Sequence, residues 1–500
     1  MISRWFVGCS LVLGLIAAGC GSDGGVSGTG GIGGIGGAGG AGGSGGVPFV
    51  PPEYGSWVKY EPEGGTCSDG SPYKFWVEFS ETSDNVIIFF EGGGACWDYE
   101  SCSGSSGIRG AANPNGLDDD HAVANQEFEG VKIDAKFVYP LLNDDLAVSP
   151  MADWNKVFVP YCTGDVYSGQ RTLTYSDPDG VEPDNEFRHL GHTNVLAMID
   201  ELNTMFSSIP RLFVSGCSAG GAGAIVNYHF LRSGLNAVGT GYLLDDSGPL
   251  YPSSKPTSRS LPVQEQIRSS WDIDPLIMSA PNPSDIFADF GNLSTVLASQ
   301  YPNDRLAVTH FRLDYNYSLY SYERFYDNDS GSLMPIELGS APGLDEDNWV
   351  DRADIYSLWG DDIGLLRAQY DAVDNLGYYL PFYRDTNDSH CVTIPGFDDA
   401  SGDALAEAIS FILSNGETGS VEAMAWAGSD MTVGQDTLNL RDYVDHLLDD
   451  STPLQSHIED TAEGHYLACA PGSYNESACM SAVCERLSSA KQTEQGCPSP

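Results

Sequence analysis

The sequence predicts an α/β fold in which a central, mostly parallel sheet is flanked by helices. Two short apolar runs, at residues 86–90 and 211–214, have the β-branched and aromatic content of strands that are buried on both faces. Each run ends in a glycine-rich turn, and the second turn leads into a helix-compatible stretch at residues 222–231. Strands that alternate with helices in this way are typical of parallel sheets, because parallel strands need long crossover connections.

Ser218 lies in the turn between the second apolar run and that helix, within the sequence VSGCSAGGAG. Gly216 and Gly220 give the G-x-S-x-G spacing of a nucleophile elbow, a turn so sharp that it leaves no room for Cβ atoms beside the serine. The helix that follows directs its N-terminal amides toward Ser218, where they would stabilise a developing oxyanion. On the pentapeptide alone, a glycine-rich turn with a bystander serine remains an alternative.

A second glycine-rich segment, EGGGACW at residues 91–97, follows the first apolar run directly. Acyl-transfer enzymes of the α/β-hydrolase type carry such a loop after an early strand, so that a backbone N–H can face the carbonyl oxygen of the substrate. Three glycines alone could also form a plain turn. Their position upstream of a nucleophile elbow, with each segment at the end of an apolar strand, favours an α/β-hydrolase-like fold.

Three further segments carry specific motifs: NKVFVPYCTGDVYSG at residues 155–169, GYLLDDSG at 241–248, and Ser389-His390-Cys391. Together with EGGGAC at 91–96 and the Ser-Ala-Gly-Gly that begins at Ser218, they resemble motifs of the pectin acetylesterases of plants and bacteria and of the animal carboxylesterase Notum. The first block is the most specific, because no general demand of a fold requires Pro-Tyr-Cys followed by Asp-Val-Tyr-Ser-Gly. The resemblance covers roughly residues 52–449 and implies a serine carboxylic-ester hydrolase.

A nucleophilic Ser218 needs an imidazole to accept its proton and a carboxylate to orient that imidazole. In α/β-hydrolases the chain order is serine, acid, histidine. We predict His390 as the base, because it follows a strand-like stretch at residues 377–383 and a polar loop, and it matches the Ser-His position of the family. His229 lies in the helix after the elbow and is expected to point away from it. The alternatives, which match no motif, are His446, His457 and His465.

We predict Asp314 as the acid of the triad. It ends the strand-like run LAVTHFRL at residues 306–313, and the acids of the resembling family follow the corresponding strand. Asp385 and Asp388 remain alternatives, although both lie close in sequence to His390.

The oxyanion N–H groups are predicted at three positions. Gly93 and Gly94 are implied by the loop of the resembling family, and Ala219 is the residue after the nucleophile. Asp165 is expected to hold its glycine-bounded loop through hydrogen bonds from the backbone to its side chain. Two aspartates of the GYLLDDSG segment would be structural or line the substrate site: Asp245 and Asp246.

The first twenty residues predict an exported, lipid-anchored protein. A basic start, an apolar run at residues 6–18 and small residues before Cys20 resemble a bacterial lipoprotein signal. The apolar run is too short to span a membrane. A lipid at Cys20 would anchor the protein to the bacterial outer membrane or cell surface, with simple secretion as the alternative.

The rest of the chain divides into three parts. Residues 21–47 form a Gly/Ser-rich tether, residues 48–452 the α/β-hydrolase-like esterase domain, and residues 453–500 a disulfide-rich C-terminal tail. Within the esterase domain, residues 103–142 are rich in Gly, Asn and Asp. We expect this interval to be an insertion at the active-site edge, serving as a lid or a substrate-binding loop rather than as part of the sheet.

Export makes disulfides expected, and an even number of cysteines follows Cys20. The family's bridge after its Gly-Gly motif implies a bond between Cys96 and Cys102. Cys217 is a rival nucleophile beside Ser218, but an elbow exposes only its central residue. No cysteine spacing suggests zinc, so we expect no metal and no cofactor. Two local bridges are expected among the cysteines of the tail: Cys469, Cys479, Cys484 and Cys497.

The chain is strongly acidic, with 23 basic and 70 acidic residues and a formal net charge of −47. Such a field repels nucleic acid, which excludes nucleic-acid binding. It also fits poorly with pectin, which is itself a polyanion. Either a local positive patch, with Arg109, Arg171 or Arg188, receives the polysaccharide, or the substrate is neutral.

The sequence therefore predicts a monomeric, extracytoplasmic serine esterase that removes acetyl or other acyl groups from carbohydrate. Acetylated pectin or a related polysaccharide is the first candidate substrate, and small acyl esters are a second. One alternative is a Notum-like deacylase of lipid or protein. The other is a surface-tethered binding lipoprotein that keeps the hydrolase fold without its chemistry. In each case the membrane is reached only through the lipid at Cys20.

Overall fold

The computed structural model of the protein describes residues 49–459 except for several gaps. The predicted signal and tether, the four cysteines of the tail, Asp385, Asp388 and His465 lie outside the described residues. The gaps are residues 129–130, 256–257, 328–333, 336–349, 351, 384–388, 395–428, 430 and 434–435.

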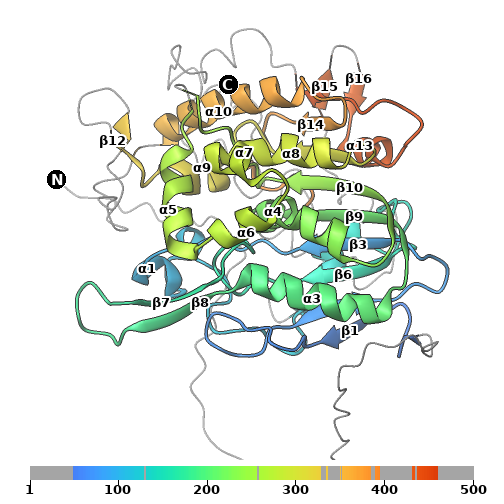
Figure 1. Cartoon of the computed structure of the whole chain (residues 1–500), viewed down its shortest axis with the longest axis horizontal. Helices are drawn as coiled ribbons and strands as arrows, with labels where there is room; N and C mark the ends of the chain where they lie inside the picture. Colours follow the sequence, from blue (N-terminus) through green and yellow to red (C-terminus); the bar gives the residue numbers. More distant parts are fainter. Residues whose placement is uncertain are drawn as a thin grey trace, which may run out of the picture.

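A nine-stranded sheet runs through the centre of the described part of the protein (Figure 1). Its strand order is β1-β2-β6-β3-β9-β10-β11-β14-β17. From β6 to β17 every neighbouring pair is parallel, whereas β1 and β2 are added to one edge in antiparallel fashion. The predicted α/β class with a mostly parallel sheet is confirmed. The strands are β1 Trp57–Tyr60, β2 Phe75–Glu78, β3 Val86–Phe90, β6 Asn155–Val159, β9 Ile209–Cys217, β10 Val238–Asp246, β11 Arg305–Thr309, β14 Leu376–Leu380 and β17 His457–Ile458.

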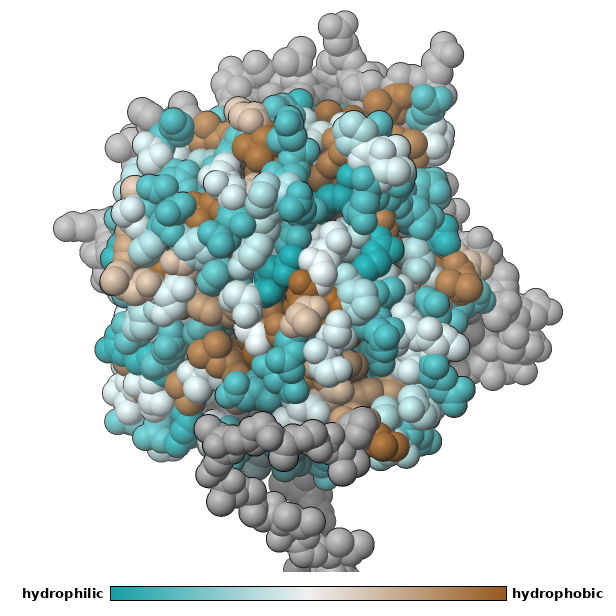
Figure 2. Space-filling model, turned by 45° about the vertical axis from the view of Figure 1, so that its right-hand side comes forward, coloured by the Kyte–Doolittle hydropathy of each residue, from teal (hydrophilic) through white to brown (hydrophobic). Residues whose placement is uncertain are grey.

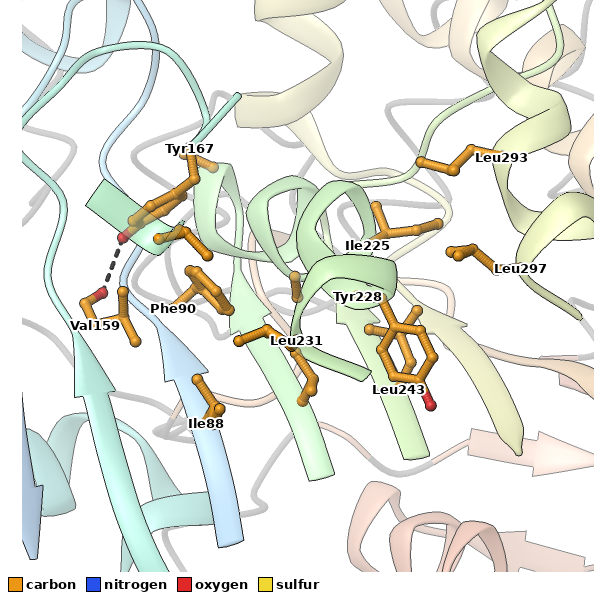
Figure 3. Packing of buried hydrophobic residues seen from close by; sticks show 14 of the residues in the cluster. Ile88, Phe90, Val159, Tyr167, Ile225, Tyr228, Leu231, Leu243, Leu293 and Leu297 are labelled. Carbon is orange, nitrogen blue, oxygen red and sulfur yellow. Dashed lines mark hydrogen bonds between the residues drawn. The ribbon is translucent and has the colours of Figure 1, made fainter. Parts of the chain in front are cut away.

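Helices cover both faces of the sheet, which explains why its central strands read as continuous apolar runs. Successive residues of β3 alternate between two buried clusters: Ile88 and Phe90 face one of them, and Ile87 and Phe89 face the other. Figure 3 shows the first cluster, where Ile88 and Phe90 approach Leu231 of the helix that follows β9. The first face is covered by α3 Gly191–Met205, α4 Ala219–Gly234, α8 Leu293–Gln300 and α10 Arg352–Tyr370, and the second by α2 Ala135–Val138 and α13 Leu440–Leu447.

Several smaller elements surround this core, and β7 and β8 project from its side as a hairpin (Figure 1). In the predicted insertion at residues 103–142, the described residues form the antiparallel pair β4–β5 and contribute no strand to the central sheet. The remaining elements are α1 Tyr99–Cys102, η1 Gly107–Arg109, β4 Gln126–Phe128, β5 Val131–Ile133, η2 Pro140–Leu142, β7 Arg171–Tyr175, β8 Asn185–His189, α5 Leu261–Trp271, α6 Asp274–Ser279, α7 Pro283–Ala288, η3 Phe290–Asn292, α9 Tyr315–Tyr322, β12 Tyr326–Asp327, β13 Met334–Pro335, β15 Met431–Val433 and β16 Asp436–Leu438.

The order of the strands gathers the predicted site residues at one edge of the sheet. β3, β9, β10, β11 and β14 are consecutive neighbours and parallel, so their carboxyl ends lie together. The glycine loop follows β3, Ser218 follows β9, and Asp314 and His390 lie in the connections after β11 and β14. Ligand sites of open α/β sheets form outside the carboxyl ends of the strands.

Three disulfides occur among the described residues: Cys67–Cys162, Cys96–Cys102 and Cys217–Cys391. The second is the predicted pair and is confirmed. Disulfides of this number indicate an oxidising compartment outside the cytoplasm. The central sheet also extends past residue 452, where the sequence suggested that the tail begins, because β17 pairs with β14.

One face of the molecule is mostly hydrophilic. Figure 2 shows a face on which hydrophilic side chains predominate and hydrophobic residues form small, separate patches. Across the described part of the chain, no helix combines the length and the apolar character needed to cross a membrane.

Candidate active site

Ser218 sits on a strained strand-to-helix turn between β9 and α4. Its backbone has φ 60° and ψ −122°, a conformation that residues with a side chain rarely adopt. The turn is tight enough that a Cβ at Gly216 would overlap the carbonyl oxygen of Gly220, and one at Gly220 would overlap that of Phe90. The Ser218 amide donates to the Asp246 carbonyl oxygen at 2.8 Å. These contacts explain the G-x-S-x-G spacing as a packing requirement of the elbow.

Asp314 and His390 are brought together, although 76 residues separate them in the chain. The Nδ1 atom of His390 lies 3.0 Å from each carboxylate oxygen of Asp314, and the Asp314 side chain is fully buried. Asp314 is also the N-cap of α9, since its Oδ1 accepts the amide of Tyr317 at 3.0 Å. The carboxylate is therefore fixed at the start of its helix, with both oxygens facing the imidazole of His390.

The Cys217–Cys391 disulfide joins the two halves of the candidate site. Cys217 directly precedes Ser218, Cys391 directly follows His390, and the two half-cystine Cα atoms are 5.6 Å apart. The backbone beside Ser218 is thus held next to the backbone beside His390. The bridge also removes Cys217 from consideration as a nucleophile, because a disulfide sulfur carries no thiolate.

Sequence reasoning did not identify this bridge. A signal was present, because Cys217 and Cys391 each adjoin a predicted member of the triad. Pairing across 174 residues, however, cannot be deduced from cysteine spacing.

The glycine loop after β3 passes beside the elbow. A Cβ at Gly92 would lie 3.3 Å from that of Ser218, and the carbonyl oxygen of Gly93 accepts the amide of Ala112 at 2.8 Å. Gly94 has φ +68°, and a Cβ there would overlap the Gly110 carbonyl oxygen and the Tyr320 hydroxyl. Only glycine fits this approach, so the loop is shaped by its contacts with the insertion.

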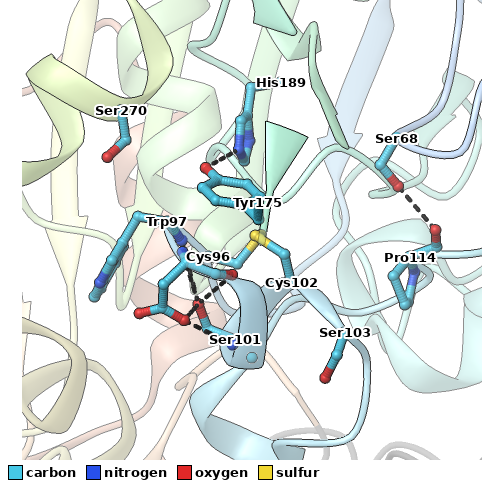
Figure 4. The surroundings of a disulfide bond; sticks show 12 residues. Ser68, Cys96, Trp97, Ser101, Cys102, Ser103, Pro114, Tyr175, His189 and Ser270 are labelled. Atoms are coloured by element: carbon cyan, nitrogen blue, oxygen red, sulfur yellow. Dashed lines mark hydrogen bonds between the residues drawn. A yellow bond between two sulfur atoms is a disulfide. The ribbon is translucent and has the colours of Figure 1, made fainter. Parts of the chain in front are cut away.

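The Cys96–Cys102 disulfide fastens the far end of this loop (Figure 4). The Cys96 amide donates to the Gly164 carbonyl oxygen at 2.9 Å, and the Trp271 indole N–H donates to the Cys96 carbonyl oxygen at 2.8 Å. Three connections, to Cys102, Gly164 and Trp271, thus hold the end of the loop.

Glu91 anchors the near end of the loop from a buried position. Its carboxylate accepts the amide of Tyr161 at 3.0 Å and the side-chain N–H of Asn125 at 2.5 Å, and both oxygens lie 3.0 Å from His121 Nε2. Burial alone would lower the pKa of His121, but attraction to Glu91 and the hydrogen bond outweigh it and raise that pKa. The sequence did not suggest a role for His121.

Asp165 is fully buried and holds its loop as expected. Its carboxylate accepts from Thr163 Oγ1 at 2.7 Å and from the amides of Tyr167, Gly169 and Gly191 at 3.1, 3.1 and 2.7 Å. Burial raises its pKa to about 6, with these donors acting in the opposite direction.

An apolar cavity of about 80 Å³ opens beside Ser218. Gly94 and Ala219, two of the predicted oxyanion donors, line it together with Ser218, whereas Gly93 does not. No charged side chain is found among the described residues of its wall. The aromatic residues of the wall are Trp97, Tyr251, Trp271, Tyr317 and Tyr320.

The three arginines proposed for a positive patch have separate partners. Arg109 makes a two-pronged ion pair with Glu323, at 2.8 and 2.9 Å, and the Glu323 side chain is almost fully buried. Arg188 pairs with Glu186, and Arg171 donates to the carbonyl oxygen of Ser269 at 2.9 Å. Two of the three charges are therefore balanced by carboxylates.

One group of metal-ligating residue types occurs within the described ranges, formed by Cys96, Cys102 and His189 (Figure 4). Both sulfurs are committed to the disulfide. His189 Nδ1 lies 3.0 Å from the Thr163 carbonyl oxygen and its Nε2 lies 2.8 Å from the Tyr175 hydroxyl, while burial lowers its pKa to about 3. A bonded disulfide and a doubly hydrogen-bonded imidazole do not offer the ligands that a metal needs.

Comparison with known proteins confirms the resemblance found in the sequence. Residues 57–272 match the pectinacetylesterase family model. Pectin acetylesterase 4 of Arabidopsis thaliana is 29% identical over 197 residues, which cover 38% of this chain and 42% of that protein. The palmitoleoyl-protein carboxylesterase NOTUM of Drosophila melanogaster is 27% identical over 216 residues, covering 41% of this chain and 29% of that protein. The match thus spans less than half the length of each of these relatives.

Among solved structures, the Wnt deacylase Notum from Drosophila aligns over 71% of this chain and 92% of its own, with 18% identity and a TM-score of 0.41.

Proposed function

We propose, from the pectinacetylesterase-family region at residues 57–272, that the chain is a serine carboxylic-ester hydrolase that removes acetyl groups from a carbohydrate. The single observation that carries the proposal is the contact of His390 with Asp314, on a loop bridged to the residue beside Ser218. A base oriented by a buried acid and tethered to a serine on an elbow is the arrangement that acyl transfer requires. A binding protein without chemistry would have no need of it.

The mechanism has two steps that share the same groups. Ser218 Oγ attacks the ester carbonyl carbon while His390 Nε2 accepts its proton, and the amides of Gly93, Gly94 and Ala219 stabilise the oxyanion. Collapse of the tetrahedral intermediate expels the alcohol, which takes the proton from His390. Water then attacks the acyl-enzyme with His390 as base, and the acid is released. Asp314 keeps the Nδ1–H tautomer of His390 and stabilises the imidazolium formed in each step.

The cavity beside Ser218 favours a short acyl group. Its volume of about 80 Å³ is well below the roughly 150 Å³ of an engineered cavity that accepts benzene. An acetyl group fits such a space, whereas a long acyl chain would need further room. The apolar wall is the observation that keeps a Notum-like deacylase of lipid-modified protein as the second candidate.

On the alcohol side, the charges favour a neutral ester. The ion pairs of Arg109 and Arg188 leave less positive charge for a polyanion, and the whole chain carries −47. Acetylated pectin, suggested by the relatives, would have to approach against this field. We therefore rank neutral acetylated polysaccharide beside pectin as the substrate, at the cell surface if Cys20 is lipidated.

The proposal is tested by the Ser218→Ala variant on a chromogenic acetyl ester. We expect turnover to fall by at least about 10³-fold, with an unchanged circular dichroism spectrum and thermal midpoint. Retention of more than a few per cent of the wild-type rate would remove Ser218 from its role. Full activity in a variant of an unrelated surface serine, Ser451→Ala, serves as the control.

A further inference from the structure

The residues directly before and after His390 have unfavourable backbone conformations. Its neighbours Ser389 and Cys391 have φ 57° and 59°, in the left-handed region that residues with a Cβ avoid. Such a conformation is unfavourable for a residue with a side chain and persists only where the surroundings impose it. Something in the fold must therefore hold the loop at residues 389–394 in this conformation.

The carboxylate of Asp246, the last residue of β10, holds this loop in place. It is fully buried and accepts the amides of Val392 and Thr393 at 2.9 and 2.7 Å and the Thr393 hydroxyl at 2.5 Å. The next residue extends the contact, since Ser247 Oγ accepts the Cys391 amide at 3.1 Å and donates to Asp246 Oδ1 at 3.0 Å. Three successive amides after His390 are thus fixed through one carboxylate.

The main chain of Asp246 holds the nucleophile at the same time. Its carbonyl oxygen accepts the Ser218 amide at 2.8 Å, and in the sheet it is the register partner of Cys217. Cys217 in turn is bonded to Cys391. Asp246 therefore binds the turn at Ser218 through its backbone carbonyl and the loop at residues 389–394 through its carboxylate.

We propose that Asp246 is a positioning residue that fixes His390 relative to Ser218, with Ser247 and the Cys217–Cys391 bridge as its supports. This inference rests on the proposed function, since it assigns a role within the same site. The side-chain hydrogen bonds of Asp246 reach the amides of Val392 and Thr393, the Thr393 hydroxyl and Ser247 Oγ. It acts through the loop backbone, so its loss displaces the base without removing any group that binds substrate.

Asp246→Asn keeps the size of the side chain but replaces one acceptor oxygen by an NH2 group, which repels an amide donor. We expect kcat for an acetyl ester to fall by about 10²-fold, as misplacement of a reacting group by about 1 Å does, with KM changed less than about twofold. The matched control is Asp289→Asn. Asp289 is also buried and accepts the amides of Ser253, Ser254 and Gly291. None of these three residues belongs to the loop at residues 389–394.

Thr393→Val is a milder second variant, because it removes only the hydroxyl donated to Asp246. It should lower kcat several-fold at constant KM, and it decides the question if Asp246→Asn does not fold. Equal kcat values in Asp246→Asn and Asp289→Asn, or an unchanged kcat in Thr393→Val, would overturn the inference. A rise of KM alone would do so as well.

A spectroscopic measurement separates this inference from the proposed function. The Nδ1–H proton of His390, bonded to Asp314, should give a strongly deshielded proton resonance that shifts or disappears in Asp246→Asn and persists in Asp289→Asn. That signal does not depend on turnover. If Ser218→Ala proves as active as the wild type, the proposed function fails, while the resonance still tests the positioning by Asp246. An unaltered resonance in Asp246→Asn contradicts it.

Discussion

The imidazole of His390 faces the carboxylate of Asp314 symmetrically, with Nδ1 at 3.0 Å from both oxygens. The same carboxylate caps α9 through the Tyr317 amide, so a helix end fixes its orientation. If Asp314 is the acid of the proposed triad, a carboxylate held in this way needs no rearrangement when the imidazole becomes charged. The contact supports the choice of Asp314, while the alternatives Asp385 and Asp388 lie outside the described residues.

Asp314→Asn tests the orienting role without disturbing the fold. Asn is as good an N-cap as Asp, so α9 should keep its stability. An amide in place of the carboxylate favours the wrong tautomer of His390, and kcat should fall by about 10³- to 10⁴-fold. Steady-state rates together with urea unfolding would check this. A rate within tenfold of the wild type at equal stability would show that Asp314 is not the acid.

Gly94→Ala tests whether the glycine loop must approach as closely as it does. The new Cβ would overlap the Gly110 carbonyl oxygen and the Tyr320 hydroxyl, and the positive φ adds strain. We expect kcat to fall by about 10²-fold or more, as after loss of one oxyanion donor. Gly55→Ala is the control, because Gly55 has φ +67° but open space around its Cβ position. It should cost about 1–2 kcal/mol of stability and no activity. Similar activities of the two variants would count against the role of the loop.

The pair of His121 and Glu91 should make stability depend on pH in a defined direction. The pKa of His121 is raised because Glu91, aided by Asp118 and Asp120, outweighs the effect of burial. Its contribution, on the order of 1–3 kcal/mol, is therefore complete below the unfolded value near 6.5 and disappears as pH rises through the folded pKa. Urea unfolding should show His121→Gln clearly less stable than the wild type at pH 5.5, with a smaller difference at pH 9.

His229 provides a control of opposite sign for that measurement. Burial lowers its pKa, so the wild type should lose stability relative to His229→Gln as pH falls. A difference between wild type and His121→Gln that grows with rising pH would refute the account of the pair.

Ionic strength should separate the two candidate polysaccharides. Repulsion between a chain of charge −47 and polygalacturonate is screened within about 10 Å at 0.1 M salt. If pectin is the substrate, kcat/KM on it should rise markedly with salt or calcium, while that on a neutral acetyl ester changes little. If neutral acetylated xylan is cleaved faster than pectin at every salt concentration, pectin is rejected as the substrate, while the proposed esterase activity is not.

The strands in the middle of the sheet could be predicted best, because a strand that is buried on both faces has apolar residues at every position. Residues 86–90 are β3 to the residue. The run at 211–214 gives only the middle of β9, which extends to Ile209–Cys217. Its outer residues pair with β3 and β10 through backbone hydrogen bonds. Several of these residues are polar or glycine, and such residue types do not indicate a buried strand.

The start of α4 could not be predicted for a similar reason. The helix begins at Ala219 rather than at residue 222. Gly220 and Gly221 are weak helix formers, so the sequence did not predict a helix there, but close contacts require glycine at both positions. A Cβ at Gly221 would overlap the Asp246 carbonyl oxygen. The same closeness of α4 to β10 places Asp246 where it can hold the site.

The residues that chemistry demands could be proposed from motifs, whereas those that hold them could not. Ser218, Asp314 and His390 each come after a strand-like run, and their chain order is that of serine, acid and histidine in α/β-hydrolases. Asp246 was expected to be structural or to line the substrate site, and its contacts with Val392 and Thr393 cross about 146 residues of chain. Nothing local in the sequence encodes such a contact. The predicted signal and tether and the tail cysteines stay predictions.

The central claim is that Ser218 is an activated nucleophile, and covalent labelling tests it most directly. The wild-type protein would be treated with a fluorophosphonate, digested, and analysed by mass spectrometry for the position of the adduct. We predict a single adduct on the peptide that contains Ser218, and no labelling of Ser218→Ala. Labelling of that variant at the wild-type rate, or an adduct on a different residue of the wild type, would contradict the account.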